Sequence, residues 1–405
     1  MNKTKLSVDL QVLLKKITEY LGNNIKPGIL IIGDTPLDVY WICRTSRKNF
    51  HQDHAQVAKQ SQFDVKYEIK RPGTVYANAK LLKELGYPVS VITCLGEDET
   101  GKFIAGEYNK LGINLIAPII KGASFQRHYI LNESEFSGEY HGRYDMVQRI
   151  NHEPDIDNGL FSKNDFATSH YEKIRDALLN CQYILINDTQ KGTLTWHDGR
   201  GSGGIKAGIL HHYFIDQTKL LNKEITILDS RRSIEYYKDV KIRLLTSSTY
   251  EVEMSLKHFP DNLKTHADPG SALEKGLLKK LNKDYPDIEN WALTRGANGI
   301  QLGISDYEER TMNCFIQPVV VNQNEVSGFT PHCGDFFDAG VITGFSSGLD
   351  IAESITFGSL LGGLQACQTN AEVISKDNIM DAVTTYSSSS AKHVQMTQLF
   401  SIKMQ

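Results

Sequence analysis

Six short, mainly apolar runs recur along this 405-residue chain. Each ends in, or is followed by, Gly or a small polar residue. Runs of four or five mainly apolar residues between turn signals are typical of buried strands. They occupy residues 29–32, 89–93, 183–186, 225–228, 242–245 and 291–294. Helical periodicity lies between most of them, for instance over 77–85 and 174–179. The alternation predicts an α/β fold, a mainly parallel sheet flanked by helices on both faces, with ligands beyond the carboxyl ends of its strands.

Two segments interrupt the alternation of strands and helices. Residues 39–72 are long, polar and rich in Arg, Lys, His and Gln, and residues 125–145 alternate between apolar and polar positions. We expect both to form a small β-lid over one edge of the sheet. Residues 1–25 are expected to form an N-terminal amphipathic helix that packs on the body or on a partner. The remaining residues, 26–405, are expected to be one domain.

Composition and charge exclude several classes of protein. The net charge is −4 with both signs interspersed, which argues against a nucleic-acid partner bound through a broad basic face. No apolar run has the length of a membrane span, and the N-terminus lacks the continuous apolar core of a signal peptide. The six cysteines form no CxxC pair and the histidines show no metal-binding spacing. We therefore expect a cytoplasmic protein with free thiols and no contact with a membrane.

The most informative stretch is His332 to Gly340, with the sequence His-Cys-Gly-Asp-Phe-Phe-Asp-Ala-Gly. It predicts a turn that opens a helix, with Asp335 in the first turn. Backbone N–H groups at a helix start lack partners and attract anions, and a carboxylate beside them can accept a proton from an attacking hydroxyl. That combination serves phosphoryl transfer. The alternative is that Asp335 only caps the helix.

Eight landmarks in order resemble the ribokinase-like (PfkB) sugar kinases. They are Gly-Asp-Thr-Pro-Leu-Asp-Val-Tyr-Trp at 33–41, Arg-Pro-Gly-Thr-Val-Tyr-Ala-Asn at 71–78, Gly-Glu-Asp-Glu-Thr-Gly at 96–101, Asp-Thr-Gln-Lys-Gly at 188–192, Leu-Asp-Ser-Arg at 228–231, Leu-Leu-Thr at 244–246 before Glu251, Leu-Thr-Arg-Gly at 293–296 before Gly299, and His-Cys-Gly-Asp-Phe-Phe-Asp-Ala-Gly at 332–340. The likeness runs over about residues 29–368. It is greatest to the kinase module of the bacterial heptose-phosphate kinase/ADP-heptose synthase enzymes.

The resemblance implies an ATP- and Mg²⁺-dependent phosphotransferase acting on a hydroxyl of a sugar or sugar phosphate. Asp335 corresponds to the catalytic base of the family. His332, Cys333 and Gly334 correspond to the anion hole, whose backbone N–H groups stabilise charge on the transferred phosphoryl group.

The resemblance also assigns the sugar site. Asp38 and Asn78 match residues that hydrogen-bond sugar hydroxyls, and Gly73 matches a turn that the sugar approaches closely. Arg127 resembles a lid arginine that faces the phosphate of a sugar phosphate, and Lys191 is a second candidate for that phosphate. The structural alternatives are a strand-end cap for Asp38, a polar helix residue for Asn78 and a solvated strand residue for Arg127.

For the nucleotide and metal, the resemblance assigns Thr294, Gly296 and Gly299 to the turn beneath the phosphates and ribose. Glu251 matches the glutamate that organises Mg²⁺ through water, and Ser248 stands where the family has the Asn of an Asn-x-x-Glu element. The structural alternatives are an acidic residue at a helix start for Glu251 and a plain strand-turn-strand for the glycines.

The sequence departs from the family at several positions. His332 and Cys333 replace the usual Gly-Ala, and a side chain at the first of these strains a turn that Gly satisfies freely. Thr74 replaces the second Gly of the sugar turn, and Ser359 replaces an adenine-side Asn. The His-x-Gly-His motif of the nucleotidyltransferase half of the bifunctional relatives is absent, so we do not expect synthesis of an activated sugar.

Two other functions stay open at this point. One is a catalytically degenerate protein that binds a sugar or nucleotide on a kinase scaffold, which the His332–Cys333 departure suggests. The other is a nucleoside kinase. The family resemblance further implies a homodimer formed through the lid strands.

Overall fold

The computed structural model describes most of the chain. The described residues are 6–23, 25–44, 64–120, 124–133, 144–152, 168–197, 205–230, 234–248, 283–295, 299–305, 311–316, 331–368, 373–388 and 401–404.

The body is built on an 11-stranded sheet in the order β1-β19-β18-β17-β16-β15-β14-β11-β2-β5-β7. All six predicted strands are confirmed as contiguous, mutually parallel members of this sheet. They are β2 (Ile29–Gly33), β5 (Val89–Ile92), β11 (Tyr183–Asp188), β14 (Ile225–Ser230), β15 (Ile242–Ser248) and β16 (Asn290–Thr294). The edges are β7 (Asn114–Ile116) on one side and the antiparallel β17 (Ile300–Ser305), β18 (Thr311–Ile316), β19 (Ser401–Met404) and β1 (Leu6–Ser7) on the other.

The register of the strands divides their side chains between two cores. One row across the sheet joins Ile31, Leu185, Ile227 and Leu244, and the adjacent row joins Ile32, Ile186, Leu228 and Leu245. All eight side chains are fully buried, the first row in one hydrophobic cluster and the second in another. Because successive strand residues point to opposite faces, each apolar run supplies both cores, as expected for a sheet covered on both sides.

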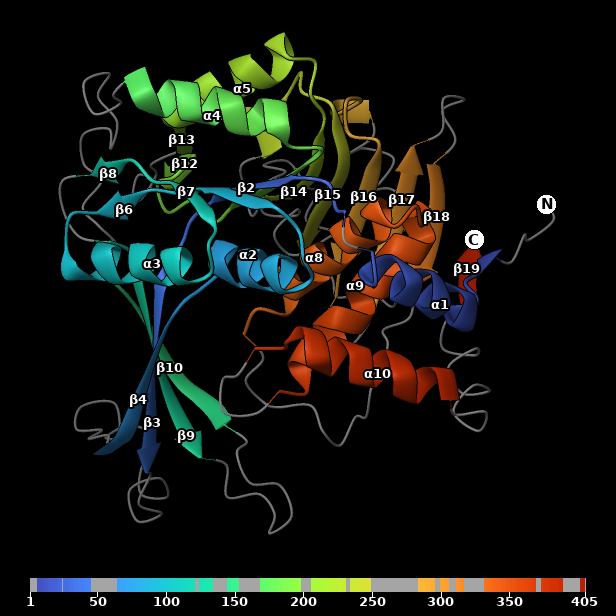
Figure 1. Cartoon of the computed structure of the whole chain (residues 1–405), viewed down its shortest axis with the longest axis horizontal. Helices are drawn as coiled ribbons and strands as arrows, with labels where there is room; N and C mark the ends of the chain where they lie inside the picture. Colours follow the sequence, from blue (N-terminus) through green and yellow to red (C-terminus); the bar gives the residue numbers. More distant parts are fainter. Residues whose placement is uncertain are drawn as a thin grey trace, which may run out of the picture.

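Helices form a layer on each face of the sheet, as Figure 1 shows. One layer holds α4 (Thr168–Asn180) and α5 (Ile209–Leu220), whose buried apolar residues belong to the second core. The other layer holds the helices that pack into the first core. These are α1 (Leu10–Leu21), α2 (Val75–Glu84), α3 (Glu99–Lys110), α8 (Cys333–Ser346), α9 (Ile351–Ala366) and α10 (Lys376–Ser388). Among the described residues, no helix is long and apolar enough to span a membrane.

Helix α1 is capped by the Asp9 side chain, which accepts from the backbone N–H groups of Gln11 and Val12. Its apolar face, which includes Leu13, Leu14 and Ile17, is buried in the first core. Helical spacing at the N-terminus thus produces a helix that packs on the body of the same chain.

Helices α8 and α9 cross closely because glycines face each other at the contact. A Cβ on Gly340 would lie 2.7 Å from the Cα of Gly358.

Gly340→Ala is therefore expected to destabilise the chain by about 1–3 kcal/mol through overpacking. Gly106→Ala in α3 is the matched control, because nothing lies within 4 Å of its added Cβ. It should stabilise by about 0.5–1 kcal/mol through helix propensity. Chemical denaturation measures both, and equal effects would contradict the close packing.

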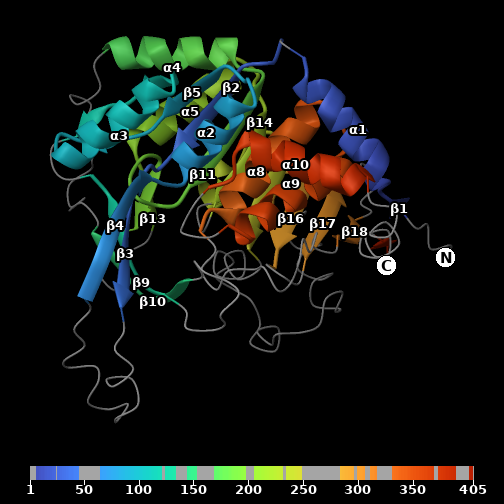
Figure 2. The same cartoon turned by 60° about the horizontal axis from the view of Figure 1, so that its bottom comes forward.

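The second sheet has four strands in the order β10-β9-β3-β4 and extends away from the body (Figures 1 and 2). It consists of β3 (Leu37–Arg44), β4 (Asp64–Pro72), β9 (Gln126–Glu133) and β10 (Tyr144–His152). Segment 39–72 supplies most of β3 and all of β4, and segment 125–145 supplies β9, but β10 lies mostly beyond the predicted segment. Residues 45–63 and 134–143 of these segments lie outside the described part of the chain. The remaining short elements are β6 (Leu95–Gly96), β8 (Ile119–Ile120), β12 (Thr195–His197), β13 (Ile205–Ala207) and the 3₁₀ turn Ile234–Tyr237.

Candidate active site

A cavity of about 490 Å³ lies between the carboxyl ends of the parallel strands, the start of α8 and the small sheet. Strands β11, β14, β15 and β16 supply its floor, and β9 and β10 supply the lid side. Its lining residues are Thr74, Arg127, Tyr129, Met146, Arg149, Asn187, Thr189, Asp229, Thr246, Ser247, Ser248, Thr294, Pro331, His332, Cys333, Gly334, Asp335, Phe337 and Asp338. This is the edge of the sheet at which α/β proteins bind ligands.

Helix α8 begins at the cavity, as the sequence predicts. His332 is its N-cap residue, with a left-handed backbone (φ 67°), and its carbonyl accepts from the N–H of Phe336 at 3.0 Å. Asp335 lies in the first turn. The first N–H groups of a helix have no carbonyl one turn earlier to bind, and the helix dipole adds positive charge there. The start of α8 is therefore suited to holding an anion in the cavity.

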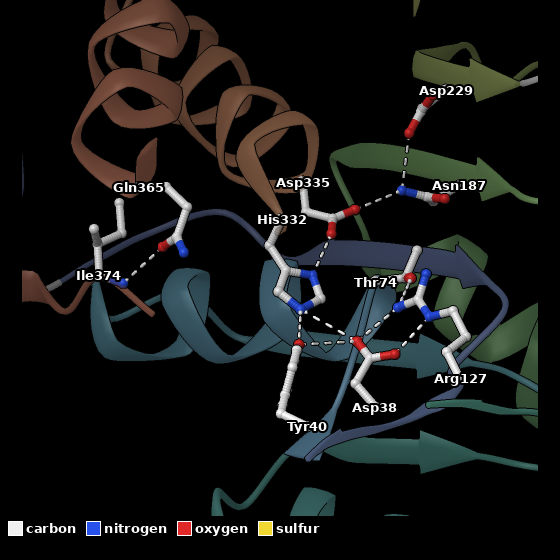
Figure 3. A network of polar contacts seen from close by, with 10 residues as sticks. All are labelled: Asp38, Tyr40, Thr74, Arg127, Asn187, Asp229, His332, Asp335, Gln365 and Ile374. Carbon is white, nitrogen blue, oxygen red and sulfur yellow. Dashed lines mark hydrogen bonds and ion pairs between the residues drawn. The ribbon is translucent and has the colours of Figure 1, made fainter. Parts of the chain in front are cut away.

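The Asp335 carboxylate faces this cavity but has hydrogen-bond partners on both oxygens (Figure 3). Its Oδ2 lies 2.8 Å from Nδ1 of His332, and its Oδ1 accepts from Nδ2 of Asn187 at 3.1 Å. The same Asn187 amide nitrogen donates to Asp229 Oδ2 at 2.9 Å. The side chain of Asp335 keeps 12% exposure. A group in the cavity can thus approach Asp335, but it meets the His332 ring beside it.

Asp38 and Arg127 form a buried ion pair next to this site. Arg127 Nε donates to Asp38 Oδ1, and Arg127 Nη2 donates to Asp38 Oδ2 at 2.7 Å. Burial alone would raise the pKa of Asp38, but the Arg127 and His332 charges outweigh it and hold that pKa below its ordinary value. The Asp38 side chain is 0% exposed. A Cβ on Gly73 would clash with both partners, so the pair needs glycine there.

Thr74 and His332, which the resemblance places at glycine positions, both have a positive φ. Thr74 has φ 52° and His332 has φ 67°, in the region that favours glycine. Each side chain also contacts the ion pair: Thr74 Oγ1 accepts from Arg127 Nη2 at 3.1 Å, and His332 Nε2 lies 3.3 Å from Asp38 Oδ2. These contacts offset backbone strain with polar interactions in the same place.

Solved structures of sugar kinases share this architecture. Ribokinase from Giardia lamblia superimposes with a TM-score of 0.61 at 14% identity, covering 89% of this chain and all of that one. Phosphofructokinase-2 from Escherichia coli does so with a TM-score of 0.57 at 12% identity, covering 90% of this chain and 100% of the other. The chain therefore has the ribokinase-like fold. The fold that the sequence predicts is therefore confirmed.

Sequence similarity also links this ribokinase-like chain to the bifunctional protein HldE of Campylobacter jejuni. HldE of C. jejuni subsp. jejuni serotype O:2 is 32% identical over 270 residues, which are 66% of this chain and 47% of HldE. HldE of C. jejuni subsp. doylei is 31% identical over the same length. The chain thus spans about half the length of the curated relatives it matches. No family model matches the chain.

The cavity is lined by only part of the residues that the sequence suggested. His332, Cys333, Gly334, Asp335, Arg127, Ser248 and Thr294 line the cavity. Asp38, Gly73, Asn78, Lys191 and Gly299 do not border it. Glu251 and Gly296 lie outside the described residues.

The predicted residues away from the cavity have other surroundings. Asn78 is fully buried in α2, and neither of its amide atoms has a hydrogen-bond partner among the described residues. The Lys191 ammonium lies 5.4 Å from the Phe125 ring centroid, and its backbone N–H donates to Asp34. Gly299 has φ 91° and its carbonyl accepts from Arg295 at the turn between β16 and β17.

The structure adds site residues that we did not select from the sequence, namely Asn187, Asp229, Asp338 and Arg149. Asn187 and Asp229 carried a usable signal, because each is a polar residue at the end of an apolar strand. Asp338 carried none, since it lies inside the apolar face of α8 and is 1% exposed. Burial and the Asp229 charge raise the pKa of Asp338 well above its ordinary value.

Oxygen atoms dominate the strand-end wall of the cavity, which carries Asp229, Thr246, Ser247 and Ser248. Carboxylates and hydroxyls of this kind suit a magnesium ion that retains water and phosphate ligands. No three His, Cys, Asp or Glu side chains within the described ranges are arranged to hold a metal ion by themselves.

Proposed function

We propose that this chain is an ATP- and Mg²⁺-dependent phosphotransferase that transfers the γ-phosphoryl group to a hydroxyl of a sugar or sugar phosphate. The observation that carries the proposal is the Asp335 carboxylate in the first turn of α8, at the wall of the cavity beneath the lid. The fold it shares with a ribokinase and a phosphofructokinase supports the same activity.

In the proposed reaction, Asp335 takes the proton of the acceptor hydroxyl while the hydroxyl oxygen bonds to the γ-phosphorus. The bond from that phosphorus to the bridging oxygen breaks, and ADP leaves with the electron pair. Backbone N–H groups of Cys333 and Gly334 would stabilise the charge on the transferred oxygens. A Cβ on Gly334 would meet nothing within 4 Å, so the backbone is open to a ligand there.

The strands of the small sheet that border the cavity supply positive charge for an anionic substrate. Arg127 and Arg149, on β9 and β10, both line the cavity. The Arg127 fork is bound to Asp38, so we assign the phosphate of a sugar phosphate to both arginines rather than to Arg127 alone. The predicted sugar-binding role of Asp38 requires the buried pair to rearrange when substrate enters.

The nucleotide phosphates would lie along the strand-end wall, where Ser248 and Thr294 offer hydroxyl groups. Bound magnesium would neutralise phosphate charge during transfer. Asp229 is the candidate ligand of that ion on this wall. The role assigned to Glu251 stays a prediction from the family resemblance.

The proposal is tested by incubating the purified chain with Mg-ATP and a panel of hexoses, heptoses and their phosphates. We expect at least one acceptor to raise ADP formation well above the acceptor-free rate, and mass spectrometry to find the phosphorylated product. Acceptor-independent ADP formation across the whole panel would contradict the proposal.

A second candidate function is a sugar- or nucleotide-binding protein without turnover. The contact between His332 Nδ1 and Asp335 Oδ2 favours it, because the ring occupies one oxygen of the proposed base. Thermal stabilisation by nucleotide and by a sugar of the panel, with no ADP formed from any combination, would support this second function over the first.

A further inference from the structure

The His332 ring bridges two parts of the molecule (Figure 3). On one side its Nδ1 lies 2.8 Å from Oδ2 of Asp335, which belongs to α8 and the body. On the other side its Nε2 lies 3.3 Å from Oδ2 of Asp38 and 3.3 Å from the hydroxyl of Tyr40, both on lid strand β3. The His332 side chain is 5% exposed. One imidazole therefore joins the proposed base to the lid sheet.

The two carboxylates decide the charge of this ring. An ionised carboxylate can only accept hydrogen bonds, so a ring nitrogen that faces one must donate. With a carboxylate opposite each nitrogen, the doubly protonated imidazolium is the form of His332 that satisfies both contacts. Burial alone would lower the pKa of His332, but Asp335 and Asp38 outweigh it and raise the pKa to about 9.

The other groups near the His332 ring do not cancel the rise in its pKa. On β3, Tyr40 contacts Nε2, and burial raises the pKa of Tyr40 well above its ordinary value, so it stays neutral. On β9, Arg127 pairs with Asp38 and Tyr129 stacks on Tyr40 with centroids 5.1 Å apart. Asp38 is thus shared by two cations, which leaves the Asp335 charge as the main partner of the imidazolium.

We propose that His332 is a positioning residue that latches Asp335 to the lid sheet, and that an acceptor hydroxyl must displace its ring to reach the base. The inference rests on the proposed function. A hydroxyl gives its proton to a carboxylate oxygen to which it is hydrogen-bonded. Asn187 holds Oδ1 of Asp335 and His332 holds Oδ2, on the side that faces Asp38. The ring therefore competes with the acceptor for the same oxygen, and it competes most strongly when charged.

The backbone at His332 allows a clean test. With φ 67°, the position accepts Gly or Asn without added strain. His332→Gly removes the ring, and His332→Asn keeps a polar side chain that carries no charge. Agreement between the two variants separates loss of the imidazolium from a change in local packing.

The first experiment needs no substrate. The full chain with ¹³C-labelled histidine is titrated by NMR, and His332 is assigned among the 13 histidines by its loss in His332→Asn. We expect this ring to stay protonated through neutral pH and to titrate near pH 9. Asp335→Asn should lower that value by about one pH unit or more. A His332 ring that titrates at or below its ordinary value of about 6.5 overturns the latch.

The second experiment uses an acceptor from the panel. For the parent chain, kcat/KM for the acceptor should rise by up to about tenfold per pH unit between neutral pH and pH 9, as the ring loses its proton. In both His332 variants this rise should vanish, and at neutral pH the acceptor KM should be lower while the ATP KM is unchanged. A variant that keeps the parent pH profile, or that loses activity at neutral pH with unchanged acceptor KM, overturns the latch.

The two experiments separate the latch from the activity on which it rests. If no acceptor is phosphorylated, the proposed function fails while the NMR titration still decides whether His332 is the charged bridge. If acceptors are phosphorylated and the ring is neutral at neutral pH, the latch fails and the proposed function stands.

Discussion

Asp335→Asn is expected to lower the rate of phosphoryl transfer by about a thousandfold, the typical contribution of a general base. The amide has nearly the shape of the carboxylate, but it cannot take the proton of the acceptor hydroxyl. ADP formation measured with the best acceptor of the panel gives the loss. Nucleotide-dependent thermal stabilisation should persist, because the backbone N–H groups of Cys333 and Gly334 remain.

Asp9→Asn is the matched control for this variant. Asp9 also stands at a helix start, where it caps α1 through Gln11 and Val12. Asn caps a helix about as well as Asp, so folding and activity should both be retained. If Asp335→Asn turned over within about tenfold of the parent rate, Asp335 would be excluded as the base and reduced to a structural residue.

Arg127→Met is expected to destabilise the chain by about 3–5 kcal/mol, because it leaves the Asp38 carboxylate buried without its main counter-ion. Both side chains of the pair are nearly inaccessible, at 7% for Arg127 and 0% for Asp38. Urea unfolding followed by circular dichroism measures the change. The double variant Asp38→Leu with Arg127→Met should recover part of the loss, since apolar residues can replace a buried pair at little cost.

Lys102→Met provides the control for the buried pair. Lys102 and Glu99 also form an ion pair, but their side chains are 68% and 89% exposed. Solvent screens such a pair, so this variant should unfold as the parent does. An Arg127→Met variant as stable as Lys102→Met would contradict the view that the buried Asp38–Arg127 pair stabilises the fold.

The acid dependence of the buried pair has a defined sign. The pKa of Asp38 lies below its ordinary value. Its contribution to the stability of the folded chain is therefore complete above about pH 4 and is lost as the pH falls through the lowered pKa. His332 acts in the opposite sense. Its contribution is complete below about pH 6.5 and is lost as the pH rises through about 9. The contributions of Asp38 and His332 are therefore both complete between about pH 4 and about pH 6.5.

The local pattern of the sequence determined the secondary structure and the central parallel sheet of this protein. Apolar runs at 29–32 and 183–186 became β2 and β11, and the polar residues that close such runs lie at one edge of the sheet. The stretch from His332 became the start of α8, with Asp335 at the cavity. Burial of strands, helix capping and turn geometry depend on residues close together in the chain, so the sequence alone carried them.

Only the tertiary structure decided how the charged side chains pair. Asp38 and Arg127 are 89 residues apart, and they meet because β3 and β9 align them as partners in one parallel ladder. His332 comes between Asp38 and Asp335 only when α8 lies against the lid sheet. Such pairings depend on the register of distant strands and on the packing of whole layers, which no local pattern specifies. For that reason the sequence could single out Asp335, Asp38 and His332 as candidate residues, but not the contacts that join the His332 ring to both carboxylates.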